Sequence, residues 1–139
     1  MRQLLVIFLL LTSFEPAAEE NKEHFLTDFI AGSYRLIGKA PDSKNTYYGT
    51  ITFRKNADSL TVVRTVGHGV SYGKSAVEKA LHGETEVLRI TFREADTDYE
   101  ETCLISGDLD NYARLTCYLY RPGVKTDDPG LEAFFIKRE

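Results

Sequence analysis

The sequence of 139 residues lacks a long hydrophobic run, a cluster of positive charge, internal repeats and low-complexity tracts. Its longest apolar stretch, Leu4 to Leu11, is much shorter than the roughly 20 residues that a membrane-spanning helix needs. The net charge is −4, whereas nucleic-acid binding depends on Lys and Arg that neutralise phosphates. We therefore expect one domain that neither inserts into a membrane nor binds nucleic acid.

The short apolar stretch suits the hydrophobic region of a signal peptide. It follows Met1 and Arg2, which form a minimal positive start, and the polar segment EPAAEENKEH comes directly after it. We predict a signal peptide over residues 1–18 and a single domain over residues 19–139 that is secreted or periplasmic. The alternative is a buried N-terminal strand or helix.

Cysteine is scarce, and the chain holds only Cys103 and Cys117. An even count in an oxidising compartment predicts a disulfide. A zinc site would need more ligands than two cysteines and three scattered histidines supply. The two cysteines are symmetric about Asp110, so a hairpin through GDLDNY would place them opposite one another. Spacing alone also permits two free thiols.

The rest of the chain is a succession of short segments in which apolar and polar residues alternate. In one of them Gly49, Ile51 and Phe53 share a face, which is typical of antiparallel strands with one buried side. The apolar spacing in HFLTDFIAG predicts a short helix before the first strand, and KSAVEKALHGE is compatible with another helical turn. The predicted strands are 33–38, 47–54, 59–66, 69–73, 86–93, 98–107, 112–120 and 131–137.

Eight sequential strands need a way to protect their edges. An up-and-down barrel has no edges, and a sandwich of two four-stranded sheets is the alternative. Periodicity does not separate the two architectures.

Gly32-Ser33-Tyr34, with Gly38 at the end of the same strand, resembles the glycine–x–aromatic start of calycin barrels, the lipocalin and avidin group. In that group the aromatic residue plugs the closed end of the barrel. The segment YYGTITF, with Tyr48 and Gly49, is similar to the second strand of small bacterial barrels of this type, and GLEAFF would close the ring. The resemblance implies an all-β, eight-stranded antiparallel up-and-down barrel with a short N-terminal helix. The chain departs from lipocalins and avidins in lacking tryptophan, so the resemblance bears on architecture more than on ligand.

Residues suited to catalysis or metal binding show no matching pattern. The three histidines lie in unlike contexts, and His68, between glycines, is expected on an exposed turn. Acidic residues recur at every second position from 94 to 100, but Tyr99 and Ile105 stand where a calcium loop needs glycine and glutamate. We therefore assign these acidic residues to a solvated turn. We therefore predict no enzyme activity, no metal site and no cofactor.

Binding is better supported, because an eight-stranded barrel encloses room for packed side chains or for one small ligand. An inward Arg64 would need an acidic partner or an anionic ligand head group. We predict an exported, non-catalytic protein that binds a small apolar or amphiphilic molecule. The alternatives are a filled interior and a protein-binding module, such as an inhibitor of a secreted hydrolase, that presents GHGVSYG and RPGVKTDDPG. The candidate ligand-binding residues are Tyr34, Tyr47, Phe53, Arg64, Phe92, Leu115 and Leu119.

Overall fold

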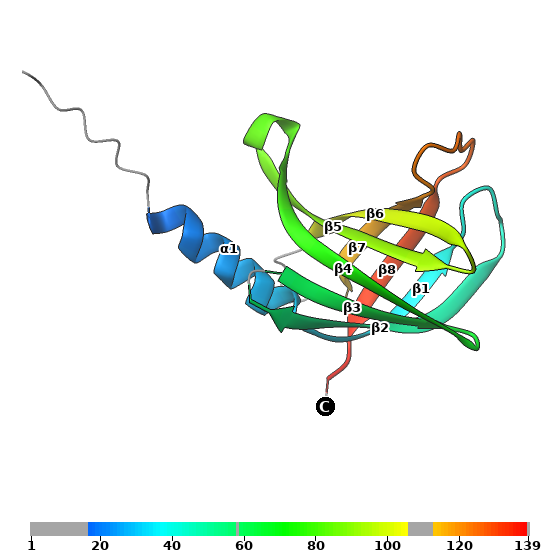
Figure 1. The fold of residues 1–139 in the computed structure, drawn as a ribbon, viewed down its shortest axis with the longest axis horizontal. Coiled ribbons are helices and arrows are strands. Elements are labelled where there is room, and N and C mark those ends of the chain that lie inside the picture. The colour runs from blue at the N-terminus through cyan, green and yellow to red at the C-terminus, as the bar shows by residue number, and fades with distance from the viewer. Residues whose placement is uncertain (1–16, 58, 106–112, 139) are drawn as a thin grey trace, which may run out of the picture.

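The computed structural model describes residues 17–57, 59–105 and 113–138. One helix precedes a ring of strands (Figure 1). The elements are α1 (Ala17–Ile30), β1 (Gly32–Lys39), β2 (Thr46–Asn56), β3 (Ser59–Val66), β4 (Gly69–Ala80), a 3-10 turn (Leu81–Gly83), β5 (Thr85–Glu94), β6 (Thr97–Ile105), β7 (Ala113–Tyr120) and β8 (Gly130–Ile136).

The eight strands form a closed antiparallel barrel in chain order, and β1 pairs with both β2 and β8. Leu36 shows the closure, because it lies opposite Gly49 on one side and Phe134 on the other. Every strand therefore has two neighbours and no edge is left open. This confirms the up-and-down barrel and rules out the sandwich.

The two-residue period decides which side chains fill the barrel. Ile51 and Phe53 of β2 are buried, as are Leu88, Ile90 and Phe92 of β5. These are the faces that the alternation predicts. Aromatic rings also meet across the interior, where Phe53 of β2 and Phe134 of β8, the two strands that flank β1, have ring centres 6.1 Å apart.

Strand β4 is longer than the sequence predicts. It continues through KSAVEKA to Ala80, and only Leu81–Gly83 form a helical turn. Lysine, glutamate and alanine favour helix locally, but β5 offers a full row of hydrogen-bonding partners, and Val77 pairs with Leu88. Pairing in the sheet overrides local preference here, as strand context commonly does.

Cys103 of β6 and Cys117 of β7 lie directly opposite one another and are joined by a disulfide. The predicted pairing is confirmed. The turn through GDLDNY falls in residues 106–112, outside the described residues.

The end of the barrel next to α1 is closed by large side chains. Ile30, Tyr34, Phe53 and Phe134 are all at most 1% exposed. The Tyr34 hydroxyl donates a hydrogen bond of 2.7 Å to the carbonyl oxygen of Ile30, so the plug also fixes the end of the helix. Tyr34 thus occupies the place that the calycin resemblance implies for the aromatic residue.

Replacing Tyr34 with phenylalanine is expected to lower the free energy of unfolding by about 1 kcal/mol, because the buried carbonyl of Ile30 loses its donor while the ring remains. Urea denaturation measures the change. Tyr72→Phe, on the exposed outer face of β4, is the matched control and should change stability little. Equal stability of Tyr34→Phe and the unsubstituted protein would contradict this role.

Helix α1 begins at Ala17, so the predicted signal-peptide boundary after Ala18 falls in its first turn. Residues 1–16 lie outside the described residues. Within the described part of the chain, no helix has both the length and the apolar character that crossing a membrane requires.

Candidate functional site

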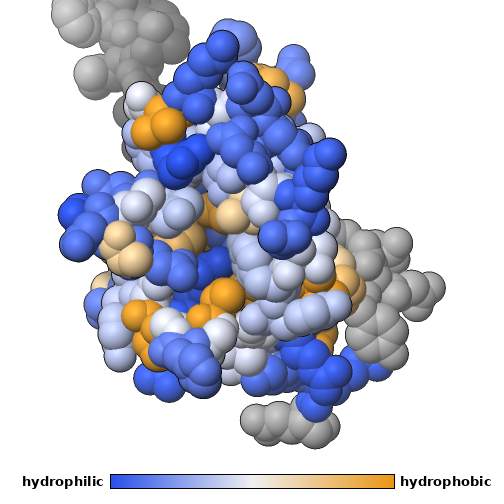
Figure 2. Space-filling model, turned by 90° about the vertical axis from the view of Figure 1, so that its right-hand side faces the viewer, coloured by the Kyte–Doolittle hydropathy of each residue, from blue (hydrophilic) through white to orange (hydrophobic). Residues whose placement is uncertain are grey.

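The opposite end of the barrel is hollowed. Figure 2 looks at this end, and hydrophobic and hydrophilic surfaces meet in a depression at its centre. Because α1 leads directly into the start of β1, the last residues of β1 mark the far end, where Gly38 lies opposite Tyr47 and Glu132. The inward-facing residues that cluster here are Tyr47 of β2, Arg64 of β3, Phe92 and Glu94 of β5, Tyr99 and Glu101 of β6, and Glu132 of β8.

Gly38 makes the meeting of two of these residues possible. A Cβ atom at this position would lie 2.8 Å from Cγ of Glu132 and 2.9 Å from Cε2 of Tyr47. Without it, the Tyr47 hydroxyl donates a 2.5 Å hydrogen bond to Oε1 of Glu132. A glycine at position 38 therefore allows Tyr47 and Glu132 to approach each other.

Arg64 is the centre of the cluster, and its side chain is only 4% exposed. Its Nη2 donates to Oε1 of Glu132 at 2.5 Å, and its Nη1 donates to Oε2 of Glu94 at 2.7 Å. Nη2 also donates to the Tyr47 hydroxyl at 3.3 Å. The acidic partner that a buried arginine needs is thus provided twice by the protein itself.

Two aromatic rings lie next to the guanidinium group. The Arg64 Cζ atom lies 4.8 Å from the ring centre of Phe92 and 5.5 Å from that of Tyr47, both within the range of cation–π attraction. Tyr99 stacks on Phe92 with ring centres 5.4 Å apart. Tyr47 and Tyr99 are half-buried, so the hollow offers aromatic surface beside charge.

The surroundings keep Arg64 charged. Burial is the largest single influence and acts to lower the pKa, but Glu132, Tyr47 and Glu94 together outweigh it and leave the pKa of Arg64 above its usual value. The same burial, with the charge of Glu132, raises the pKa of Tyr47. Both residues therefore act as hydrogen-bond donors at any physiological pH.

Glu101 is the most unusual residue of the site, because its side chain is completely buried. Burial, followed by the charge of Glu132 and a hydrogen bond with it, raises the pKa of Glu101 well above 4.5, although Arg64 acts in the opposite direction. Oε1 of Glu101 and Oε2 of Glu132 have no donor among the described residues, and Nε of Arg64 has no acceptor. A proton on Glu101 supplies the missing donor between the two carboxyl groups.

Replacing Glu101 with glutamine should stabilise the protein increasingly as the pH rises. The pKa of Glu101 is higher in the folded than in the unfolded protein. Its contribution to the free energy of unfolding is therefore complete below the pKa of the unfolded chain, about 4.3, and is lost as the pH rises through the pKa of the folded protein. Glutamine mimics the protonated form at every pH. We expect equal stability near about pH 4 and a gain of about 1 kcal/mol or more at about pH 8.

Urea denaturation across this pH range measures the difference. Glu100→Gln is the matched control, since Glu100 is the neighbouring residue on the outer face, where it binds Arg89 at 2.9 Å. A stability difference for Glu101→Gln that does not vary with pH would contradict a protonated Glu101.

The structure divides the predicted ligand-binding residues into two groups. Tyr34, Phe53 and Leu115 are fully buried and pack in the closed part of the barrel. Tyr47, Arg64 and Phe92 come together at the hollowed end, where Leu119 faces inward opposite Glu101 and Gly130.

Sequence reasoning missed the three acidic members of the cluster. Glu101 alternates with the inward Tyr99 and Cys103, and Glu132 lies between the inward Gly130 and Phe134, so the two-residue period was the available signal. Glu94 was assigned with its acidic neighbours to a solvated turn. That assignment holds for the exposed Asp96 and Asp98 but not for Glu94, which pairs with Arg64.

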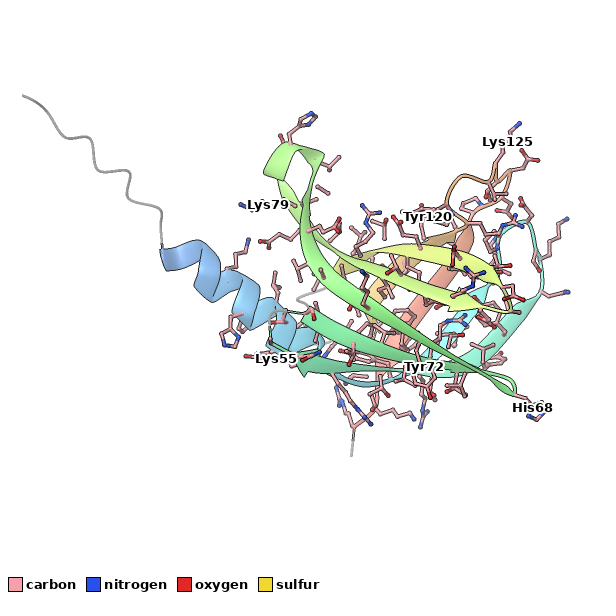
Figure 3. The ribbon with its side chains drawn as sticks, viewed as in Figure 1. Lys55, His68, Tyr72, Lys79, Tyr120 and Lys125 are labelled. Carbon is pink, nitrogen blue, oxygen red and sulfur yellow. A yellow bond between two sulfur atoms is a disulfide. The ribbon has the colours of Figure 1, made fainter. Side chains whose placement is uncertain are left out.

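Other candidate chemistry finds no assembled site in the described part of the chain. The group of three potential metal ligands found there is Glu101, Cys103 and Cys117, but its two sulfur atoms are bonded to each other and offer no thiolate. His68 is exposed at the tip of the β3–β4 hairpin, as predicted (Figure 3).

The outer wall carries exposed apolar side chains. Ile37, Leu104, Tyr118 and Leu131 are 41–60% exposed on neighbouring strands, and a shallow groove runs between them. A second set, Val70 and Tyr72, lies on the outer face of β4 within GHGVSYG.

Comparison with known proteins finds no matching family model and no matching curated protein.

Proposed function

We propose that this protein is a non-catalytic binding protein that holds a small amphiphilic molecule at the hollowed end of its barrel. The observation that supports this most is the cluster around Arg64, where buried polar atoms without partners lie beside half-buried aromatic rings. Buried polar groups are normally paired, and each one that is not calls for an explanation. A ligand with a polar end and an apolar body would supply both kinds of contact.

The closed part of the barrel gives such a site a rigid floor. Tyr34 and Phe53 meet edge to face with ring centres 5.6 Å apart, and both are buried. The ligand would therefore occupy the open half only. The glycine–x–tyrosine start, the tyrosine plug and the eight-stranded topology support a calycin-like relationship.

We propose that the protein is exported and acts outside the cytoplasm. The Cys103–Cys117 disulfide supports this, because such bonds persist in oxidising compartments. The apolar stretch near the N-terminus and the polar segment after it would provide the signal peptide.

A neutral fluorescent probe, N-phenyl-1-naphthylamine, tests the binding site. We expect saturable fluorescence enhancement with one site per chain. Tyr99→Ser should weaken binding about tenfold, because a half-buried aromatic ring contributes on the order of 1.4 kcal/mol of contact. Tyr118→Ser on the outer wall is the matched control and should bind normally. Enhancement that does not saturate, or that falls equally in both variants, would refute the proposal.

A protein-binding role is the second candidate, and the exposed Val70 and Tyr72 favour it. These side chains lie in GHGVSYG, one of the two segments expected to be presented to a partner. A stoichiometric complex with a secreted hydrolase, lost in Val70→Ser/Tyr72→Ser but kept in Leu104→Ser, would support this role. Normal complex formation by the first variant would count against it.

A further inference from the structure

The hollowed end carries more acid than base. Among the described residues of the cluster, Glu94, Glu101 and Glu132 face a single cation, Arg64. The titratable groups that interact with Glu101 are Tyr47 from β2, Arg64 from β3 and Glu132 from β8, and Glu94 of β5 reaches it only through Arg64. The inward positions of the other strands at this level are uncharged: Gly38 of β1, Ser71 of β4 and Leu119 of β7.

Arg64 is not available to an anionic ligand. Its two Nη atoms donate to carboxylates at 2.5 and 2.7 Å, and its Cζ atom lies 4.8 Å from the ring centre of Phe92 and 5.5 Å from that of Tyr47. An anion would have to displace Glu94, or displace Glu132 and leave that fully buried carboxylate without its partner, and in either case it would enter a cluster that already holds more acid than base. The cluster is therefore unsuited to the head group of a fatty acid.

Hydrogen-bond donors, in contrast, are what the two carboxyl groups need. Oε1 of Glu101 and Oε2 of Glu132 are buried acceptors without a donor, and Glu101 meets this need in the free protein only by holding a proton. A ligand ammonium group carries several N–H donors and one positive charge, so it would replace that proton and bind both oxygens.

A metal ion fits the same place less well. Among the described residues, the three glutamates do not bring one carboxylate oxygen each within 4.8 Å of the others, so they do not converge on one point. Arg64 already lies between Glu94 and Glu132 and would repel a divalent ion. An ammonium group at the end of a flexible chain needs only two of the three carboxyl groups.

We propose that the polar end of the ligand is a protonated amine, which binds between Glu101 and Glu132 and displaces the proton of Glu101 to solvent. This inference rests on the proposed binding function and specifies its ligand class. The bound state then contains R–NH₃⁺ and an ionised Glu101, and one proton leaves for each amine that binds. The apolar part of the amine would contact the rings of Phe92 and Tyr99.

Competition against N-phenyl-1-naphthylamine distinguishes the head groups. Octylamine, octanol and octanoate share one chain length and differ in charge. We expect octylamine to displace the probe at a concentration about tenfold lower than octanol, since a charge-assisted hydrogen bond is roughly twice as strong as a neutral one. Octanoate should be the weakest competitor.

Calorimetry in buffers of different ionisation enthalpy measures the proton. Octylamine binding at about pH 5.5 should release about one proton and should tighten as the pH rises. Glu101→Gln should abolish the proton release. It should also reduce the preference for octylamine over octanol to less than about threefold, because the neutral amide leaves only a neutral hydrogen bond at this position. Glu100→Gln, one residue away on the outer face, should keep both.

The outcomes separate the two proposals. If the three compounds displace the probe equally, or octanoate is the best, the binding function stands and the amine assignment is overturned. Octylamine binding without proton release also overturns it, even if the affinity is high. If neither the probe nor any of the three compounds binds, the proposed function and the amine assignment fall together.

Discussion

Replacing Arg64 with methionine is expected to lower the free energy of unfolding by about 3–5 kcal/mol. The substitution keeps a long apolar side chain but removes the cation from a site where its side chain is 4% exposed. Glu132 would be left buried in contact with Glu101, without the guanidinium that now balances its charge. An uncompensated buried carboxylate is the reason for the large effect.

Urea denaturation of two further variants tests this explanation. Arg64→Met/Glu132→Leu removes both charges and should recover a large part of the loss, because an apolar pair of similar volume replaces the ion pair. Arg93→Met is the matched control, since Arg93 is 59% exposed and its pairing with Asp98 should contribute at most about 1 kcal/mol. A double variant as unstable as Arg64→Met would show that packing, not charge, governs this site.

Removal of the disulfide is expected to have the second-largest effect. Cys103→Ala/Cys117→Ala should lower the free energy of unfolding by about 3 kcal/mol, because closing a loop with a sequence separation of 14 restricts the unfolded chain. The two positions face each other across β6 and β7, and both cysteines are buried, so the alanines leave the strand pairing unchanged.

Reduction of the unsubstituted protein provides the control. Dithiothreitol should cause a similar loss there and none in the double alanine variant. If neither the double alanine substitution nor reduction changes the free energy of unfolding, the disulfide does not restrict the conformational freedom of the unfolded chain. A loss confined to the alanine variant would point to packing around the sulfur atoms instead.

The barrel was predictable because its determinants are local. Alternation assigned Ile51 and Phe53 to the inside of β2, and the symmetry of Cys103 and Cys117 about Asp110 gave the register of β6 and β7. The length of β4 was not predictable in this way. Residues 74–80 are held extended by their pairing with β5. The sequence of one segment does not show which strand it will pair with, so this extension could not be predicted from residues 74–80 alone.

The site was predictable only in part. The sequence indicated only that an inward Arg64 would need a partner, and the partner Glu132 lies 68 positions further along the chain. They meet because β8 closes the ring against β1, and because Gly38 leaves room beside Tyr47. Closure is a property of the whole barrel, so no local pattern identifies this pair.

The most direct test of a ligand site in the open half of the barrel is nuclear magnetic resonance of the isotope-labelled protein during titration with octylamine. We expect chemical-shift changes at Tyr47, Phe92, Tyr99 and Glu101 that saturate at one equivalent, with Tyr34 and the outer-wall Tyr118 unaffected. Changes that centre on Tyr118 and Leu131, or the absence of any saturating change, would contradict it.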